Sequence, residues 1–139
     1  ANQAIERIMH LAPKDQHDKL RFDLSQNIKA IVAQQLLPTK DGEGRVAAIE
    51  ILLNSPLVSD LIQRNEIGSL KEAMKKGKEL GMQSFDMALY DLYREGSIDL
   101  DQALHHADSP NDLRLMIKLD SNDGSSLGTL SNVSIDMDD

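Results

Sequence analysis

One stretch of the sequence has the glycine spacing of a phosphate-binding turn. Gly42-Glu43-Gly44-Arg45-Val46-Ala47 fits the pattern G-x-G-x-x-A, in which backbone N–H groups can cradle a pyrophosphate. A dinucleotide site also requires a helix that opens at the glycines and further βα units in a parallel sheet. Here Asn54-Ser55-Pro56 soon stops the apolar run after the glycines, and Asp41 and Glu43 would repel a phosphate. We therefore interpret the stretch as a tight turn.

This turn predicts a β-hairpin over about residues 31–53. Apolar runs flank the turn on both sides, and the Pro and Gly residues between them interrupt regular structure. In this interpretation Gly42 and Gly44 serve backbone geometry. Arg45 and Glu50, which carry opposite charges, become candidates for a structural or interface ion pair.

The other reactive residue types form no catalytic or metal-binding pattern. The chain has no cysteine and no G-x-x-x-x-G-K-[ST] phosphate loop. Its histidines include the adjacent pair His105 and His106, which on a helix point about 100° apart and do not readily share one ion. The stretch at Asp120 resembles a calcium loop only faintly, because Ser131 stands where a bidentate Glu is needed. We expect no catalytic, cofactor-binding or metal-binding residue in this chain.

The composition favours a helical protein and argues against nucleic-acid binding. Apolar residues make up 40% of the 139 residues but aromatic residues only 3%, so the core must consist of aliphatic side chains, which suit helix packing better than a β-sandwich. The net charge is −8, so the chain lacks the excess of Lys and Arg that binds a phosphate backbone. No apolar run approaches the ~20 residues that span a bilayer, and the absence of cysteine suits the cytosol.

Capping signals divide the chain into short helices around the hairpin. Pro13 ends a first helix, and Asp15 can cap a second. After the hairpin, Ser55-Pro56 starts a helix, the stretch from Ser69 to Glu72 fits a capping box, and Asp99 can cap a further helix. The predicted fold class is therefore mostly α with one β-hairpin.

We expect this body to occupy residues 1–118, with its later helices at about 56–117. Residues 119–139 hold five Asp and no base and lack helical periodicity, which predicts an acidic flexible tail. The chain begins with Ala and already in helical periodicity, which suggests a segment of a longer protein. From the residues alone, a free-standing cytosolic helical adaptor without catalytic activity is an open alternative.

Four stretches carry a more specific signal: NQAIERI, AQQLLPTKDGEGRVAAIEILLNSPLVSDLI, ELGMQSFDMALYDLYREGSIDLDQAL and ADSPNDLRL. In order and spacing they resemble the C-terminal part of the type IV pilus retraction ATPases, the PilT and PilU twitching-motility motors. The similarity is greatest to the PilU branch. It covers residues 2 to about 117.

The resemblance implies the C-terminal helical part of a RecA-like hexameric ATPase domain. The Walker A and Walker B motifs would lie upstream, so that ATP and Mg bind there and not in this chain. The implied partners are other copies of the protein in a hexamer, the main retraction ATPase paralog and the inner-membrane platform protein of the pilus machine, at the cytoplasmic face of the inner membrane. The implied role is accessory pilus retraction, with this segment contributing oligomer interface and force transmission.

One helix matches an A-I-R-N-L-I-R-E motif that the resembled motors require for retraction. The interaction residues expected on this motor-specific helix are Leu57, Val58, Ser59, Asp60, Leu61, Ile62, Gln63 and Arg64. Its apolar positions predict a buried face, whereas Ser59 and Gln63 replace the two Arg residues of the motif and Arg64 replaces its Glu. These replacements fit the accessory branch. The structural or interface residues expected elsewhere are Gly42, Gly44, Arg45, Glu50, Gly81, Gln83 and Asp86.

Overall fold

A computed structural model describes residues 1–129. The elements are α1 (Asn2–His10), α2 (His17–Asn27), β1 (Ala30–Pro38), β2 (Arg45–Leu53), α3 (Pro56–Gln63), α4 (Leu70–Lys76), α5 (Phe85–Arg94), α6 (Leu100–His106) and α7 (Pro110–Thr129). Short 3-10 turns occupy Lys14–Gln16, Ile67–Ser69 and Lys78–Leu80. The predicted fold class, mostly α with one β-hairpin, is confirmed.

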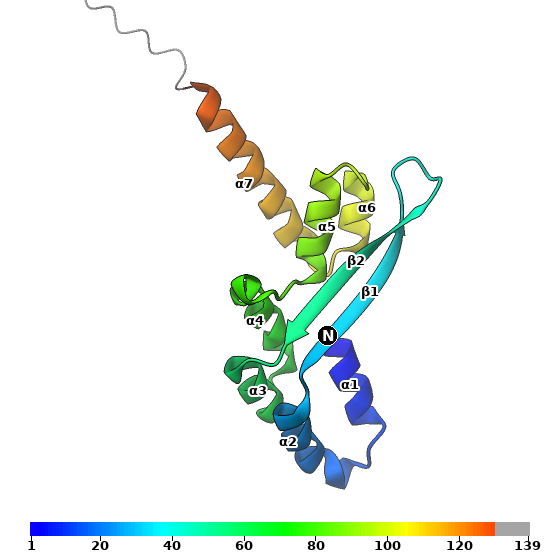
Figure 1. Ribbon diagram of the computed structural model, residues 1–139, viewed down its shortest axis with the longest axis vertical. Helices are drawn as coiled ribbons and strands as arrows, with labels where there is room; N and C mark the ends of the chain where they lie inside the picture. The colour runs from blue at the N-terminus through cyan, green and yellow to red at the C-terminus, as the bar shows by residue number, and fades with distance from the viewer. Residues whose placement is uncertain (130–139) are drawn as a thin grey trace, which may run out of the picture.

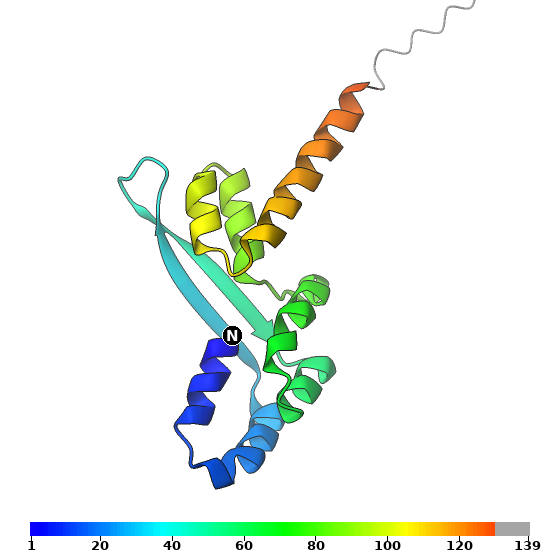
Figure 2. The same ribbon diagram turned by 180° about the vertical axis from the view of Figure 1, so that it is seen from behind.

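The hairpin runs through the middle of the molecule. β1 and β2 pair antiparallel, from Ala30 opposite Leu53 to Pro38 opposite Arg45. Helices α1 to α4 gather around the end of the hairpin at Ala30 and Leu53, whereas α5, α6 and the start of α7 lie along the half that leads to the turn (Figure 1 and Figure 2). The rest of α7 projects away from the body (Figure 1). The hairpin therefore connects two groups of helices.

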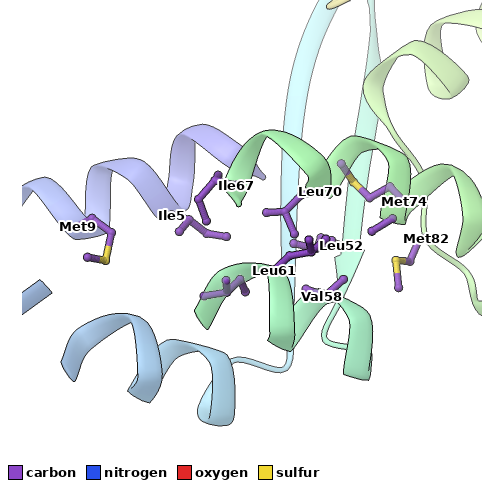
Figure 3. Close-up of a cluster of buried hydrophobic side chains, with 11 residues drawn as sticks. Ile5, Met9, Leu52, Val58, Leu61, Ile67, Leu70, Met74 and Met82 are labelled. Carbon is purple, nitrogen blue, oxygen red and sulfur yellow. The ribbon is translucent and has the colours of Figure 1, made fainter. Parts of the chain in front are cut away.

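Each group of helices has its own hydrophobic cluster. Buried side chains of the first cluster, shown in Figure 3, are Ile5, Met9, Leu52, Val58, Leu61, Ile62, Ile67, Leu70, Ala73, Met74 and Met82. Buried side chains of the second cluster are Leu37, Ala48, Ala88, Leu89, Ile98, Ala103 and Leu113. These are aliphatic residues and methionines, as the low aromatic content requires. Strand β2 contributes to both clusters, through Leu52 and Ala48.

One face of the hairpin is poorly covered. Residues that pair directly in an antiparallel ladder point to the same side, so Val32 shares a face with Ile51, and Leu36 shares it with Ala47. Val32 is 65% exposed and Leu36 is 50% exposed. Gln34, which is also exposed, lies between them on this face, and the two aliphatic side chains leave an apolar surface without a covering element in the described residues.

The local capping signals are confirmed at two helices and are wrong at two others. The Ser55 side chain accepts the Val58 N–H at 3.3 Å, and the Asp99 carboxylate accepts the Gln102 N–H at 2.7 Å. Ser69 makes no capping bond, because a 3-10 turn runs directly into α4 and gives Ser69 a helical backbone, whereas an N-cap needs an extended one. For the same reason Asp15 lies inside a 3-10 turn and does not cap α2.

Helix α7 is longer than the sequence predicted. It continues to Thr129, where we expected a flexible tail to begin at residue 119. A helix that has already formed extends at low cost, because each added residue contributes a hydrogen bond without a new nucleation step, and no Pro follows Pro110. The last part of the expected tail, residues 130–139, lies outside the described residues.

Candidate functional site

The turn between the strands uses its own amide groups. Gly42 has a φ of +74°, a conformation that favours glycine, whereas Gly44 has no positive φ and an added Cβ would meet only Thr39, at 3.8 Å. The φ of Gly42 agrees with the predicted role in backbone geometry, whereas the backbone at Gly44 does not require a glycine. Amides that have acceptors within the chain are those of Lys40, Gly42, Glu43 and Gly44.

Side chains close the turn from inside. The Thr39 hydroxyl donates to Asp41 Oδ1 at 2.5 Å and accepts the Gly44 N–H at 3.1 Å, while Asp41 Oδ1 also accepts the Glu43 N–H at 3.0 Å. The bond from Thr39, followed by the one from the Glu43 amide, lowers the pKa of Asp41. The Glu43 and Gly44 amides thus already have side-chain acceptors within the turn. The interpretation as a tight hairpin turn is confirmed.

The expected Arg45–Glu50 ion pair does not form within this chain. Positions five apart on a strand point to opposite faces, so Arg45 is exposed whereas Glu50 is 3% exposed. The Glu50 carboxylate instead contacts the α-amino group of Ala1. The prediction ignored strand alternation and is wrong for a direct pair.

Helix α3, which carries the motor-specific motif, has a buried and an outward face. Val58, Leu61 and Ile62 are buried in the first cluster (Figure 3 labels Val58 and Leu61). Leu57, expected on the same face, is 46% exposed. At about 100° per residue, the three buried side chains span an arc of about 100°, and Leu57 lies about 40° outside the edge of that arc, so it faces outward.

The outward face of α3 combines Leu57 with charged residues. Arg64 Nε lies 3.2 Å from Asp60 Oδ2, and Arg64 Nη2 lies 3.0 Å from Glu66 Oε2. Residues 57, 60 and 64 recur at spacings of three and four and so lie along one side of the helix. We call Leu57, Asp60 and Arg64 the α3 outer face. Gln63 is exposed beside it.

The residues before and inside α3 also bond to the end of α2, and no sequence pattern predicts these bonds. The Asn54 side-chain amide donates to the carbonyl oxygens of Ser25 and Ile28, both at 2.9 Å. The Ser59 hydroxyl donates to the same Ser25 carbonyl at 2.8 Å. These contacts join residues that are 26 to 34 positions apart in the sequence.

The stretch Gly81-Met82-Gln83-Ser84-Phe85-Asp86 connects the two groups of helices and fastens them to the hairpin. Gly81 has a φ of +93° and ends a 3-10 turn. Gln83 and Ile51 exchange backbone hydrogen bonds of 2.9 and 2.8 Å, and the Gln83 side-chain amide donates to the Ile49 carbonyl at 2.7 Å. Gln83 therefore pairs with the edge of β2 that does not face β1.

Asp86 holds the connection between α6 and α7. Its carboxylate is 7% exposed and accepts the N–H groups of Asp108 at 2.7 Å and Ser109 at 3.0 Å. Burial raises the pKa of Asp86, although the two backbone hydrogen bonds act in the opposite direction. Gly81 thus has a left-handed backbone conformation, and Gln83 and Asp86 bond to backbone groups of distant residues.

The lysines of α4 have acidic neighbours across the gap between the two groups of helices. Lys71 Nζ lies 3.5 Å from Asp108 Oδ2, and Lys75 Nζ lies 3.3 Å from Asp112 Oδ2 and from Glu72 Oε1. The hydrogen bond from Lys75 lowers the pKa of Asp112. Because these pairs are largely exposed, each adds little to stability, but together they leave less positive charge for an external anion.

The described part of the chain contains no assembled catalytic or metal site. An open cavity of about 920 Å³ lies between the start of α1, the hairpin and side chains of Lys71, His106 and Asp108. Its lining mixes both charges, and no group of three His, Asp or Glu residues within residues 1–129 is placed to hold a metal ion. His106 instead bonds to the Gln102 carbonyl of its own helix at 2.9 Å. No helix among these residues is long and apolar enough to cross a membrane.

Comparison with curated proteins finds similarity to pilus motors. The chain is 61% identical over 121 residues to the type IV pilus ATPase PilU of Pseudomonas aeruginosa, a match that covers 87% of this chain and 32% of that protein. It is 36% identical to a twitching motility protein of Neisseria gonorrhoeae (77% of this chain, 29% of that protein). It is 33% identical to the type IV pilus retraction ATPase PilT of P. aeruginosa (79% and 32%). The chain thus spans about a third of the length of these relatives. No protein-family model matches it.

Solved structures give the same answer for the fold. The pilus retraction motor PilT with bound ADP superimposes with a TM-score of 0.70 at 32% identity, over 82% of this chain and 31% of that one. The ATPase DotB of Legionella pneumophila shares the fold with a TM-score of 0.58 at 20% identity, over 74% of this chain and 28% of that one. By sequence and by fold, the chain belongs to the PilT and PilU family of type IV pilus ATPases.

Proposed function

We propose that this chain is the C-terminal segment of an accessory, PilU-like retraction motor ATPase, in which it supplies oligomer interface and transmits force. The observation that carries the proposal is the 61% identity to PilU over 87% of the chain, which includes the hairpin and α3. The absence of a phosphate-binding loop in residues 1–129 fits this division of labour. In the proposal, ATP and Mg bind in another part of the whole protein and not in this segment.

The poorly covered face of the hairpin supports a place inside a larger domain. Val32 and Leu36 are at least half exposed on one side of the sheet. At about 25 cal/mol per Å² of apolar surface, covering such side chains contributes a few kcal/mol of packing free energy. In the proposal, residues 1–118 complete the RecA-like ATPase domain and this face packs against its sheet. The whole protein forms a hexamer at the cytoplasmic face of the inner membrane.

The α3 outer face is the proposed motor-specific surface. It combines one exposed leucine with ion-paired charges, a pattern typical of the centre and rim of a protein interface. The proposed partners are the main retraction ATPase paralog and the inner-membrane platform protein of the pilus machine. Force produced by ATP hydrolysis then passes through this surface.

Substitution of Leu57 in the full-length protein tests the proposal. Leu57→Asp removes the apolar centre of the α3 outer face without disturbing the buried cluster, because Leu57 is 46% exposed. Leu80→Asp is the matched control, since Leu80 is 65% exposed on the turn after α4. We expect Leu57→Asp to lower the pilus retraction rate and leave ATP hydrolysis unchanged, whereas Leu80→Asp leaves both unchanged.

Normal retraction with Leu57→Asp would contradict the role of α3. The reading frame upstream of Ala1 gives an independent check, because a G-x-x-x-x-G-K-[ST] motif belongs there in a motor ATPase. A frame without that motif would favour the alternative, a free-standing helical adaptor.

A further inference from the structure

The end of α2 depends on side chains from outside the helix. The helix ends at Asn27, and the chain turns to an extended conformation at Ile28, with φ −63° and ψ 139°. The last carbonyl groups of a helix have no partner within it and must find donors elsewhere. The Leu24 carbonyl accepts the Ile28 N–H at 3.0 Å, but Ser25 and Ile28 accept from the segment that leads into α3.

Two side chains converge on one carbonyl oxygen. The Asn54 amide reaches the Ser25 carbonyl from the loop before α3, and the Ser59 hydroxyl reaches it from within α3. A third bond, from the Asn54 N–H to the Lys29 carbonyl at 3.0 Å, fixes the same loop to the chain after α2. Ser25 is 1% exposed, so water does not easily replace these donors.

The chemistry of position 54 is specific. Two carbonyl oxygens can only accept, so the Asn54 amide must present its NH2 group to them. The Asn54 side-chain oxygen is left buried without a hydrogen-bond partner among the described residues. Burying this oxygen without a partner costs free energy, so the other hydrogen bonds of Asn54 must stabilise this arrangement of the loop. A carboxylate at position 54 would place an oxygen against the two carbonyl oxygens and repel them.

We propose that Asn54 and Ser59 are positioning residues, which together set how α3 lies on α2 and therefore where the α3 outer face points. Neither residue caps its own helix, because Ser55 caps α3; their bonds cross between helices, whereas the Ser84 and Asp99 bonds stay within the first turn of their own helices. Loss of either donor leaves α3 attached to its cluster by Val58, Leu61 and Ile62 but free to rock about that contact. The functional consequence rests on the proposed function, since it assumes that the α3 outer face meets a partner.

Hydrogen exchange of the full-length protein, followed by mass spectrometry, tests the positioning role directly. In Ser59→Ala, amides of residues 55–66 should exchange about fivefold faster, the net effect of one lost hydrogen bond on local opening. Asn54→Asp should show a larger increase, because it replaces two bonds with repulsion. Ser59→Thr keeps the hydroxyl and should exchange like the unmodified protein.

Ser84→Ala is the matched control for general destabilisation. It removes one hydroxyl that accepts the Met87 N–H in the second group of helices, and it should speed exchange in α5 more than in α3. Equal exchange of α3 in Ser59→Ala and the unmodified protein would overturn the proposal, as would α3 exchange as fast in Ser84→Ala as in Ser59→Ala.

Retraction assays separate this proposal from the proposed function. If Leu57→Asp impairs retraction, Ser59→Ala should impair it too and Ser59→Thr should restore it; normal retraction in Ser59→Ala would then refute the positioning role. If Leu57→Asp leaves retraction unchanged, the proposed function of α3 has failed, and the exchange rates alone decide whether Asn54 and Ser59 position the helix.

Discussion

Replacing Asp86 tests how α5 is joined to the segment between α6 and α7. Its carboxylate is the acceptor for two backbone N–H groups, those of Asp108 and Ser109, at the start of α7. Asp86→Ala leaves both without an acceptor. Each partly buried unpaired N–H costs about 1–3 kcal/mol, and relief from burying a carboxylate offsets part of that sum. We therefore expect Asp86→Ala to lower the free energy of unfolding by about 2 kcal/mol.

Urea denaturation of the purified chain, followed by far-ultraviolet circular dichroism, measures this change. Asp91→Ala is the matched control, because Asp91 lies on the same helix but is exposed, and surface changes usually stay within about 0.5 kcal/mol. If Asp86→Ala and Asp91→Ala unfold at the same urea concentration, the carboxylate does not hold the start of α7.

The pH dependence of Asp86 supplies a second readout. Burial raises its pKa above the ordinary value of 3.8, so the folded protein binds this proton more tightly than the unfolded one does. The contribution of Asp86 to the free energy of unfolding must therefore fall as the pH rises from about 3.8 through the raised pKa. Asp86→Asn cannot titrate, and it should lose this part of the pH dependence. An unchanged pH profile in Asp86→Asn would show that burial does not perturb this group.

Three further predictions concern the core, a turn and the nucleotide. Leu70→Ala should lower the free energy of unfolding, measured by urea denaturation, by about 2–5 kcal/mol, because Leu70 is fully buried in the first cluster. Leu80→Ala should lower it by less than about 0.5 kcal/mol, and equal losses would contradict the burial of Leu70 in that cluster. Gly81→Ala should lower the free energy of unfolding by about 1 kcal/mol because of the φ of +93° at Gly81, and Gly44→Ala should leave it nearly unchanged. A larger loss in Gly44→Ala than in Gly81→Ala would contradict the backbone conformations described for the two turns. Isothermal calorimetry of the purified chain with ATP should detect no heat of binding, since the turn amides already have acceptors; measurable binding would reopen the phosphate interpretation.

Features that depend on neighbouring residues were predictable from the sequence. The hairpin followed from its bracketing Pro and Gly residues, and the starts of α3 and α6 followed from Ser55 and Asp99. In each case the residue that decides the structure lies within a few positions of the bond it makes. Ser69 shows the limit of this logic, because a preceding 3-10 turn gives it a backbone that cannot cap.

Features that depend on distant residues were not predictable. Asn54 and Ser59 bond to Ser25, and Asp86 bonds to Asp108 and Ser109. These residues are too far apart in the sequence for helix or strand periodicity to predict the contacts. The stretch around Asp86 could be recognised as characteristic of a family, but its physical role became clear only from the packing of α5 against the start of α7. The exposure of Leu57 likewise depends on which side of a short helix the first cluster occupies.

The connection at Gly81 resembles a boundary between two separate modules, but strand β2 packs against both groups of helices. Leu52 lines one cluster and Ala48 lines the other, on the same strand. If either cluster unfolds, β2 loses the side chains that pack against it there, and the other cluster loses the strand that covers it. Both halves should therefore melt in one cooperative transition, and a deletion that ends before α5 would leave Leu37 and Ala48 without a core.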